Sequence, residues 1–339
     1  MHMTRREFSL FAGAALLGGR AARAAPDPRL PVSLVLAPSN LGLRPQNGKQ
    51  PGTWRAPQVL MDAGLREALD AVAAHRLERP LYEFQAQKGT RIRNGRSIRA
   101  FSLAVAAKVK DILAVHGFPV VIGGDCSVLL GSMLGLRQAG GRGLVHVDGH
   151  SDFAQEKSYA TPQTLGAAAG MDLALATGRG EALLTDWPEV GVLAADADTI
   201  QVGERGRNQP GFMEYYGDIL STEISRMDVQ DVIASGIAAA ARRVIERLDN
   251  RGLDRAWLHV DLDVLDEKVM PAVDSPGSPG FDYRQLAELI AVLVISGRIA
   301  GADFAIYDPE LDRGHRHAPE LVRCIADGIG ARATISRTP

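Results

Sequence analysis

The chain has 339 residues, of which 46% are hydrophobic and 23% are charged, and its formal net charge is −2. This composition excludes disordered, collagen-like and coiled-coil proteins. The near balance of 38 basic and 40 acidic residues argues against a nucleic-acid-binding protein, which usually carries a surplus of basic side chains. Two cysteines, Cys126 and Cys324, are too few for a disulfide framework.

The first 24 residues have the features of an export signal. Arg5 and Arg6 precede a short, weakly apolar stretch, and a small-x-small cleavage site ends at Ala24. The apolar stretch is too short to span a bilayer. We therefore expect residues 1–24 to be a twin-arginine signal peptide and residues 25–339 to be a single domain. The mature protein would be periplasmic or secreted and would have no membrane anchor. The alternative is an ordinary amphipathic helix.

Strand and helix signals alternate along the rest of the chain. Short apolar runs predict strands over residues 32–37, 119–122, 143–147, 199–203, 256–262 and 299–306. Apolar residues at helical spacing predict helices over residues 57–76, 96–115, 127–138, 164–177, 229–247, 283–295 and 319–329. This alternation predicts an α/β fold with a parallel sheet covered by helices on both faces. In such sheets, functional residues gather in the loops after the carboxyl ends of the strands.

Three of these loops carry polar motifs. They are GGDCS at residues 123–127, DGHSD at residues 148–152 and DLD at residues 261–263. Side chains two residues apart in an extended chain point to the same side, so each pair of alternate polar residues can face one point. The four carboxylates and one imidazole are Asp148, His150, Asp152, Asp261 and Asp263.

Carboxylates packed this closely must be neutralised, and a divalent cation does so. A carboxylate-rich set with one imidazole favours manganese over zinc or copper. Because there are more acids than one ion needs, we expect two ions that share bridging carboxylates and turn a bound water into a nucleophile. A polar turn at each strand end is the simpler alternative.

The three motifs, in this order and at these separations, resemble those of the ureohydrolase (arginase/agmatinase) family over about residues 30–330. The resemblance implies a three-layer α/β/α fold with a mainly parallel, about eight-stranded sheet. It also implies a homo-oligomer (a trimer or a hexamer) and a binuclear manganese centre. The implied reaction is hydrolysis of a linear C–N bond in a small guanidine or amidine by a metal-bound hydroxide. Asp148 and Asp261 would bridge the ions, Asp152 would complete the first site, and His150 and Asp263 would complete the second.

Three departures from the family pattern bear on metal and substrate. Cys126 stands where the family has a histidine ligand, and a thiolate favours zinc, iron or nickel; alternatively, Cys126 is a buried thiol that binds no metal. Ala169 stands at the position of the family's proton-shuttle histidine. Ile306 stands at the position of the glutamate that holds a guanidinium, which argues against arginine or agmatine as the substrate. Asp308, two residues further on, is a candidate replacement.

Other polar residues are candidates for the missing roles. Asp152, His315 and His317 are candidates for proton transfer, although the two histidines also suit a solvated loop. Glu204 and Arg205 follow a predicted strand and would bind a charged substrate group or pair with each other. His146 and His259 lie two residues before Asp148 and Asp261. They would either support the metal ligands from beneath or be buried histidines without a chemical role.

Two alternative functions remain open on the sequence alone. A deacetylase-like amidohydrolase needs one metal, for which Asp148, His150 and Asp261 suffice. Asp152 and Asp263 would then have no role, and the chain has no adjacent pair of histidines. The other alternative is a catalytically inactive relative that binds a metal or another ligand.

Overall fold

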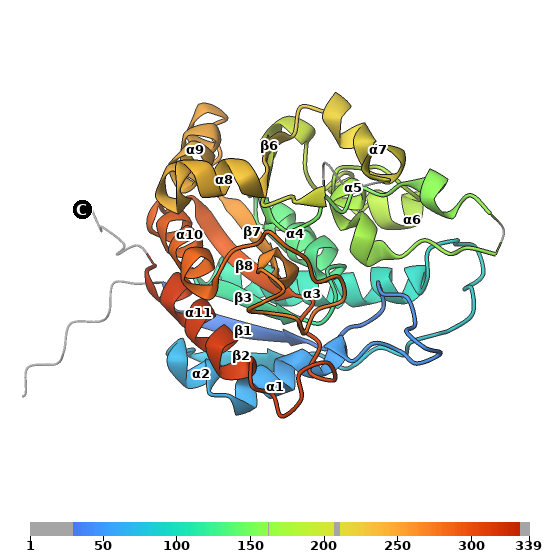
Figure 1. Cartoon of the computed structure of the whole chain (residues 1–339), viewed down its shortest axis with the longest axis horizontal. Coiled ribbons are helices and arrows are strands. Elements are labelled where there is room, and N and C mark those ends of the chain that lie inside the picture. Colours follow the sequence, from blue (N-terminus) through green and yellow to red (C-terminus); the bar gives the residue numbers. More distant parts are fainter. Residues whose placement is uncertain (1–29, 162, 207–210, 333–339) are drawn as a thin grey trace, which may run out of the picture.

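The computed structural model describes residues 30–161, 163–206 and 211–332. At its centre is an eight-stranded sheet with the strand order β2-β1-β3-β8-β7-β4-β5-β6 (Figure 1). Every neighbouring pair of strands is parallel. The strands are β1 (Val32–Ala37), β2 (Ala73–Arg76), β3 (Phe118–Gly123), β4 (Gly143–Val147), β5 (Thr199–Val202), β6 (Ser225–Met227), β7 (Ala256–Asp261) and β8 (Ile299–Ala305).

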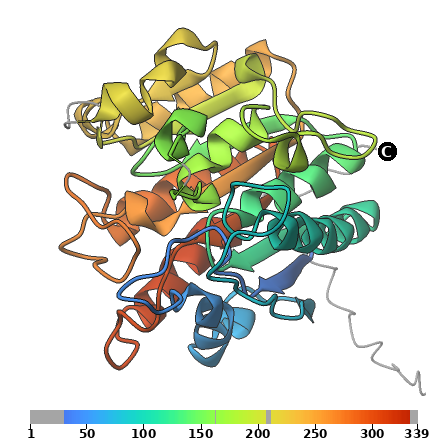
Figure 2. The same ribbon diagram turned by 90° about the vertical axis from the view of Figure 1, so that its right-hand side faces the viewer.

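Helices cover both faces of this sheet (Figure 1, Figure 2). The helices are α1 (Ala56–Asp62), α2 (Leu65–Ala68), α3 (Gly95–Ala114), α4 (Val128–Gln138), α5 (Asp172–Ala176), α6 (Ala182–Thr185), α7 (Phe212–Tyr215), α8 (Val229–Ser235), α9 (Ile237–Asn250), α10 (Tyr283–Ile295) and α11 (Ala318–Gly330). On one face α10 packs between α9 and α11, and α11 also contacts α1 and α2. On the other face α3 packs against α4 and α6, and α4 also contacts α5. The predicted three-layer α/β/α fold is therefore confirmed.

The central strands form the core. Every residue of β1, β3, β4, β5 and β7 is buried, as expected for strands of a parallel sheet that has helices on both sides. Apolar runs of this kind were the signal that predicted six strands. The two strands that the sequence did not predict, β2 and β6, lie at the two edges of the sheet. Most of their residues are only partly buried, and neither strand has a continuous apolar run.

Three predicted helices are wrong in extent. The helix predicted over residues 57–76 consists of α1, α2 and the edge strand β2, because Gly64 has a φ of +92° between the two helices. The helix predicted over residues 229–247 is interrupted at Gly236, which has a φ of +82°. Glycine adopts such left-handed conformations without steric cost and so ends helices. The helix predicted over residues 164–177 is reduced to α5, preceded by the short 3-10 turn Ala168–Met171.

The predicted signal peptide, residues 1–24, lies outside the described residues. Among the residues that the structure does describe, no helix combines the length and the apolar character needed to cross a bilayer.

Candidate metal centre

The polar motifs meet at one edge of the sheet, where neighbouring strands end. Cys126 follows β3, the loop 148–152 follows β4, and Asp261 ends β7, with Asp263 in the turn beyond it. β7 lies directly beside β4, and only β8 separates β7 from β3. The fold therefore brings together the six residues that the sequence proposed as metal ligands, in two groups of three.

The first group consists of Cys126, Asp152 and Asp261. One potential ligand atom from each side chain lies within 4.8 Å of the others, and all three residues are buried. The Cys126 thiol donates a hydrogen bond to Asp261 Oδ2 at 2.6 Å. Burial, and then the neighbouring charge of Asp261, raise the pKa of the Cys126 thiol well above its usual range. Burial and the neighbouring carboxylates therefore disfavour the thiolate form of Cys126.

The second group consists of Asp148, His150 and Asp263, and its ligand atoms meet the same distance criterion. His150 Nδ1 lies 2.8 Å from Asp263 Oδ2. The loop backbone contributes as well, because the amide of His150 donates to Asp148 Oδ1 at 2.6 Å and the amide of Gly149 donates to Asp263 Oδ1 at 3.1 Å. These bonds fix the two carboxylates on either side of the imidazole.

The electrostatics of the two groups fit a site for divalent cations. Burial, and then the charges of neighbouring acids, raise the pKa values of Asp148, Asp152 and Asp261 well above the usual range. Burial alone would lower the pKa of His150, but Asp263 raises it to about 9. Within the described residues Asp148 Oδ2 is buried and has no hydrogen-bond partner. Buried carboxylates that repel one another are stabilised by bound cations, and oxygen ligands with one imidazole suit manganese and related ions.

A cavity of about 430 Å³ opens onto both groups. Cys126, His150, Asp152, Asp261 and Asp263 form part of its lining. Further lining residues are Leu43, Arg44, Ala169, Tyr216, Asp274 and Ile306. The sequence analysis did not single out the charged residues Arg44 and Asp274, because each lies in an irregular loop outside the three motifs.

Two of the lining residues have a strained backbone. Asp152 has a φ of +42° and Ile306 has a φ of +75°. A positive φ is costly for a β-branched residue such as isoleucine. The amide of Ile306 donates to the carbonyl of Gly124 at 2.7 Å, which ties the end of β8 to the GGDCS loop. Strain of this kind concentrates at functional sites, where the surrounding structure imposes it.

Glu204 and Arg205 lie beside the metal centre rather than in the lining of its cavity. The Arg205 guanidinium donates to the carbonyl oxygen of Asp263 and lies 3.6 Å from Asp263 Oδ1. Glu204 Oε1 accepts a hydrogen bond from the amide of Gly206. Both side chains are almost completely buried. Within the described residues Glu204 and Arg205 form no salt bridge with each other; instead, Arg205 places a positive charge behind Asp263.

Asp308, His315 and His317 lie away from this cavity in the described structure. Asp308 accepts hydrogen bonds from the amides of Gly52 and Glu310, at 2.8 and 2.9 Å. His315 lines a separate cavity that also contains Trp54 and Glu310. His317 Nδ1 lies 3.4 Å from the Tyr283 hydroxyl.

The conformation of the loop after β8 keeps His315 and His317 away from the cavity. Asp312 accepts hydrogen bonds from the amides of Arg316 and His317 and from the Tyr307 hydroxyl, at 2.9, 2.9 and 2.7 Å. These bonds hold the two histidines at the start of α11.

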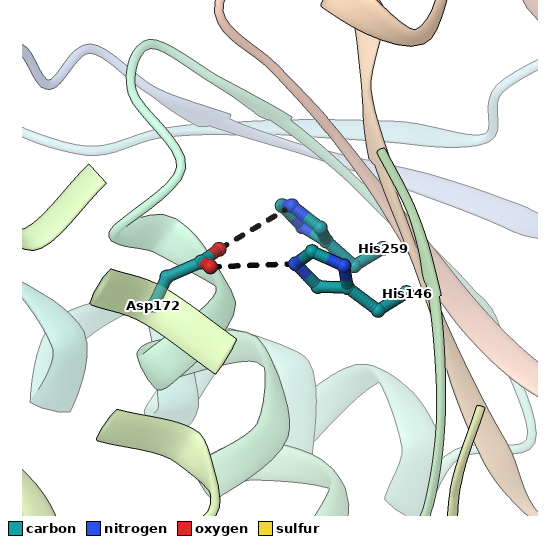
Figure 3. Close-up of side chains that lie close together, drawn as sticks. All are labelled: His146, Asp172 and His259. Atoms are coloured by element: carbon teal, nitrogen blue, oxygen red, sulfur yellow. Dashed lines mark hydrogen bonds and ion pairs between the residues drawn. The ribbon is translucent and has the colours of Figure 1, made fainter. Parts of the chain in front are cut away.

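His146 and His259 are buried in β4 and β7, and His146 Nε2 lies 3.6 Å from Asp148 Oδ2. Asp172, at the start of α5, lies against both imidazoles (Figure 3). Asp172 was not predicted from the sequence. The only signal for it was its position directly after the Gly170–Met171 pair of the loop that the family uses for proton transfer.

Comparisons with known proteins show the family to which this chain belongs. The Arginase family profile matches residues 31–327. An arginase from Bacillus caldovelox is 25% identical over 321 residues, which cover 89% of this chain and 99% of that protein. A formimidoylglutamase from Cupriavidus pinatubonensis is 27% identical over 267 residues, which cover 76% of each chain.

Solved structures show the same fold. The crystal structure of the Bacillus caldovelox arginase superimposes with a TM-score of 0.74 at 24% identity, covering 89% of this chain and 98% of that one. The formimidoylglutamase of Bacillus subtilis superimposes with a TM-score of 0.66 at 16% identity, covering 89% and 86%. The family profile and the curated relatives favour the ureohydrolase interpretation over a deacetylase-like one. The chain belongs to the arginase family of hydrolases.

Proposed function

We propose that this protein is a metal-dependent hydrolase that cleaves a linear C–N bond of a small guanidine or another amidine. The observation that carries the proposal is the pair of three-residue ligand groups at the floor of one cavity. Cys126, Asp152 and Asp261 would hold one cation, and Asp148, His150 and Asp263 the other. Asp148 and Asp261 are the carboxylates that would bridge the ions. Two divalent cations, when bound, supply a water nucleophile near neutral pH.

The metal ions are proposed to be two manganese ions, with zinc, iron or nickel favoured at the first site if Cys126 is a ligand. The Cys126 sulfur lies in the cavity lining beside Asp261, so it is positioned to bind. A soft sulfur ligand shifts the metal preference of a site from manganese towards zinc, iron or nickel.

Substrate recognition is proposed to differ from that of arginine and agmatine hydrolysis. Ile306 and Ala169 present apolar side chains to the cavity. A guanidinium therefore has no bidentate carboxylate partner at residue 306. Arg44 and Asp274 are the charged lining residues outside the two ligand groups, and they would bind ionic groups at the far end of the substrate. Asp152 also lines the cavity, so its carboxylate can exchange a proton with the reacting group.

The location and assembly of the protein are proposals as well. The twin-arginine features of residues 1–24 support export of the folded protein to the periplasm or the exterior. The family resemblance supports a homo-oligomer, a trimer or a hexamer.

The test combines metal analysis with a substrate screen. Wild-type protein and Cys126→His would be freed of loosely held ions, reloaded with manganese or zinc, and assayed for urea and ammonia release from guanidines, other amidines and amides. We expect about two exchangeable ions per chain, amidine hydrolysis, and a shift of metal preference towards manganese in Cys126→His. Cys324→Ser is the matched control, because Cys324 is also buried but lies in α11 and donates to the carbonyl of Tyr283.

Two other outcomes would support the alternative functions. One exchangeable ion in the wild type, rising to two in Cys126→His, would support the one-metal amidohydrolase. Tight metal binding without turnover of any compound would contradict the enzymatic proposal and support an inactive binding protein.

A further inference from the structure

A third group of ligand-type side chains lies beneath the two groups of the cavity. It consists of His146 in β4, His259 in β7 and Asp172 at the start of α5 (Figure 3). His146 and His259 are direct partners in the parallel register of β4 and β7, and their rings stack with centroids 4.8 Å apart. All three side chains are completely buried. The sheet itself therefore presents two imidazoles side by side to one carboxylate.

The separations between these atoms are long for hydrogen bonds, and only the contact between His146 and Asp172 meets the geometric limits of one. Asp172 Oδ1 lies 3.3 Å from His146 Nε2, and Asp172 Oδ2 lies 3.4 Å from His259 Nε2. Within the described part of the chain, neither His259 Nε2 nor Asp172 Oδ2 makes a hydrogen bond. Strong N–H···O bonds are about 2.9 Å long. In a tetrahedral zinc site with bonds of about 2.0–2.1 Å, by contrast, neighbouring ligand atoms are about 3.4 Å apart.

A fourth ligand atom is available. Asp148 Oδ1 accepts a hydrogen bond from the amide of His150, in the second group. Asp148 Oδ2 instead lies 3.6 Å from His146 Nε2. This Oδ2 is one of the buried oxygens that lack a hydrogen bond among the residues described. Asp148 therefore presents Oδ1 to His150 of the second group and Oδ2 to the buried group.

His259 is also held as a metal ligand would be. Its Nδ1 lies 2.5 Å from Asp303 Oδ2, and the indole N–H of Trp257 donates to Asp303 Oδ1. A carboxylate that accepts from one ring nitrogen fixes the tautomer and directs the other nitrogen at a metal. Here the other nitrogen is Nε2, which faces Asp172.

We propose that His146, His259 and Asp172 bind one zinc-class divalent cation at a third site beneath the two ligand groups of the cavity. Asp148, which belongs to the second group through Oδ1, would supply Oδ2 as the fourth ligand and so link the two sites. Two imidazoles and two carboxylates make a tetrahedral set that suits zinc. Because four protein ligands close the site and it has no opening to the cavity, the ion is structural and is bound as the protein folds. This proposal does not require the protein to be a hydrolase.

The test is the zinc content of the double variant His146→Gln/His259→Gln. A glutamine amide can still donate a hydrogen bond to Asp172, but it is a poor zinc ligand. Both proteins would be produced with zinc, treated with a chelator under native conditions, and subjected to elemental analysis and thermal unfolding. We expect about one chelator-resistant zinc per chain in the wild type, none in the double variant, and a lower Tm for the variant.

A cavity variant distinguishes the third site from the first two. Asp263→Asn removes a ligand of the second group, so it is expected to lose exchangeable metal and to keep the chelator-resistant zinc. Loss of hydrolysis together with retention of that zinc would leave the third site standing whether or not the proposed function is correct. Equal zinc content in the wild type and the double variant would overturn the third site and leave a hydrogen-bonded histidine cluster.

A spectroscopic measurement covers the case in which the double variant does not fold. The zinc X-ray absorption spectrum of chelator-treated Asp263→Asn protein is expected to show two imidazoles and oxygen ligands at about 2.0 Å. A spectrum with a sulfur ligand would place the ion at Cys126, and an absence of zinc would mean that the buried group binds none. Either result would refute the proposal.

Discussion

Replacing Gly149 by alanine should destabilise the metal centre through a single packing clash. Gly149 lies between Asp148 and His150, and its open side faces the guanidinium of Arg205. A Cβ at residue 149 would lie 2.3–2.4 Å from three guanidinium atoms. Such distances are far below van der Waals contact, so either the loop or the arginine must move.

Moving either the loop or the Arg205 side chain costs free energy. The Arg205 side chain is 1% exposed and donates to the carbonyl oxygen of Asp263. On its other side it packs against Gly277, where an added Cβ would lie 2.6 Å from Nε. The clash therefore has the cost of overpacking in a tight core, about 1–3 kcal/mol. At about 2–4 °C per kcal/mol, we expect the Tm to fall by roughly 2–12 °C.

The assay is thermal and urea unfolding of metal-free protein, followed by titration with manganese. Gly170→Ala is the matched control, because Gly170 also lies in the cavity lining, has a φ of −86°, and has open space where a Cβ would be. We expect the control to stay within about 0.5 kcal/mol of the wild type. Adding Arg205→Lys to Gly149→Ala should recover part of the loss, because the slimmer ammonium vacates the space of the guanidinium. Equal stability of Gly149→Ala and Gly170→Ala would refute the reasoning.

Three further predictions concern pH, metal removal and a helix end. In metal-free protein burial opposes the charge of His150, but Asp263 raises the pKa of His150 from its ordinary value of 6.5 to about 9. This shift contributes about 3 kcal/mol to the free energy of unfolding. The contribution is complete below pH 6.5 and is lost as the pH rises through 9. Urea unfolding between pH 6 and 9.5 should show this decline, and a flat profile, or an equal decline in His150→Gln, would contradict it. Chelation should lower the Tm, since an ion at 1,000 times its Kd adds about 4 kcal/mol of stability; an unchanged Tm after complete metal removal would count against the site. His116 follows α3, has a φ of +56° and is exposed. His116→Gly should therefore stabilise the protein by about 0.5–1 kcal/mol in urea unfolding, whereas Lys108→Gly within α3 should destabilise it by a similar amount. Destabilisation by His116→Gly would contradict this prediction.

The sequence alone determined the architecture of the central sheet and the main ligand groups. The strand over residues 143–147 and the helix over residues 283–295 lie where their periodicity predicted them. A buried central strand needs an unbroken apolar run, and an amphipathic helix needs a regular one, so both leave clear patterns. The convergence of the DGHSD and DLD motifs could also be predicted from the sequence, because side-chain alternation is local and parallel strands end at a common edge of the sheet.

Only the tertiary structure decided which distant residues share a site. Edge strands β2 and β6 owe their conformation to pairing with β1 and β5, not to their own composition. Hydrogen bonds to Asp312 hold His315 and His317 away from the cavity, although both follow the last strand. Asp172 reaches His146 and His259 from a helix in another part of the chain. Contacts of this kind depend on how separate elements pack, and no pattern within one segment of sequence encodes that packing.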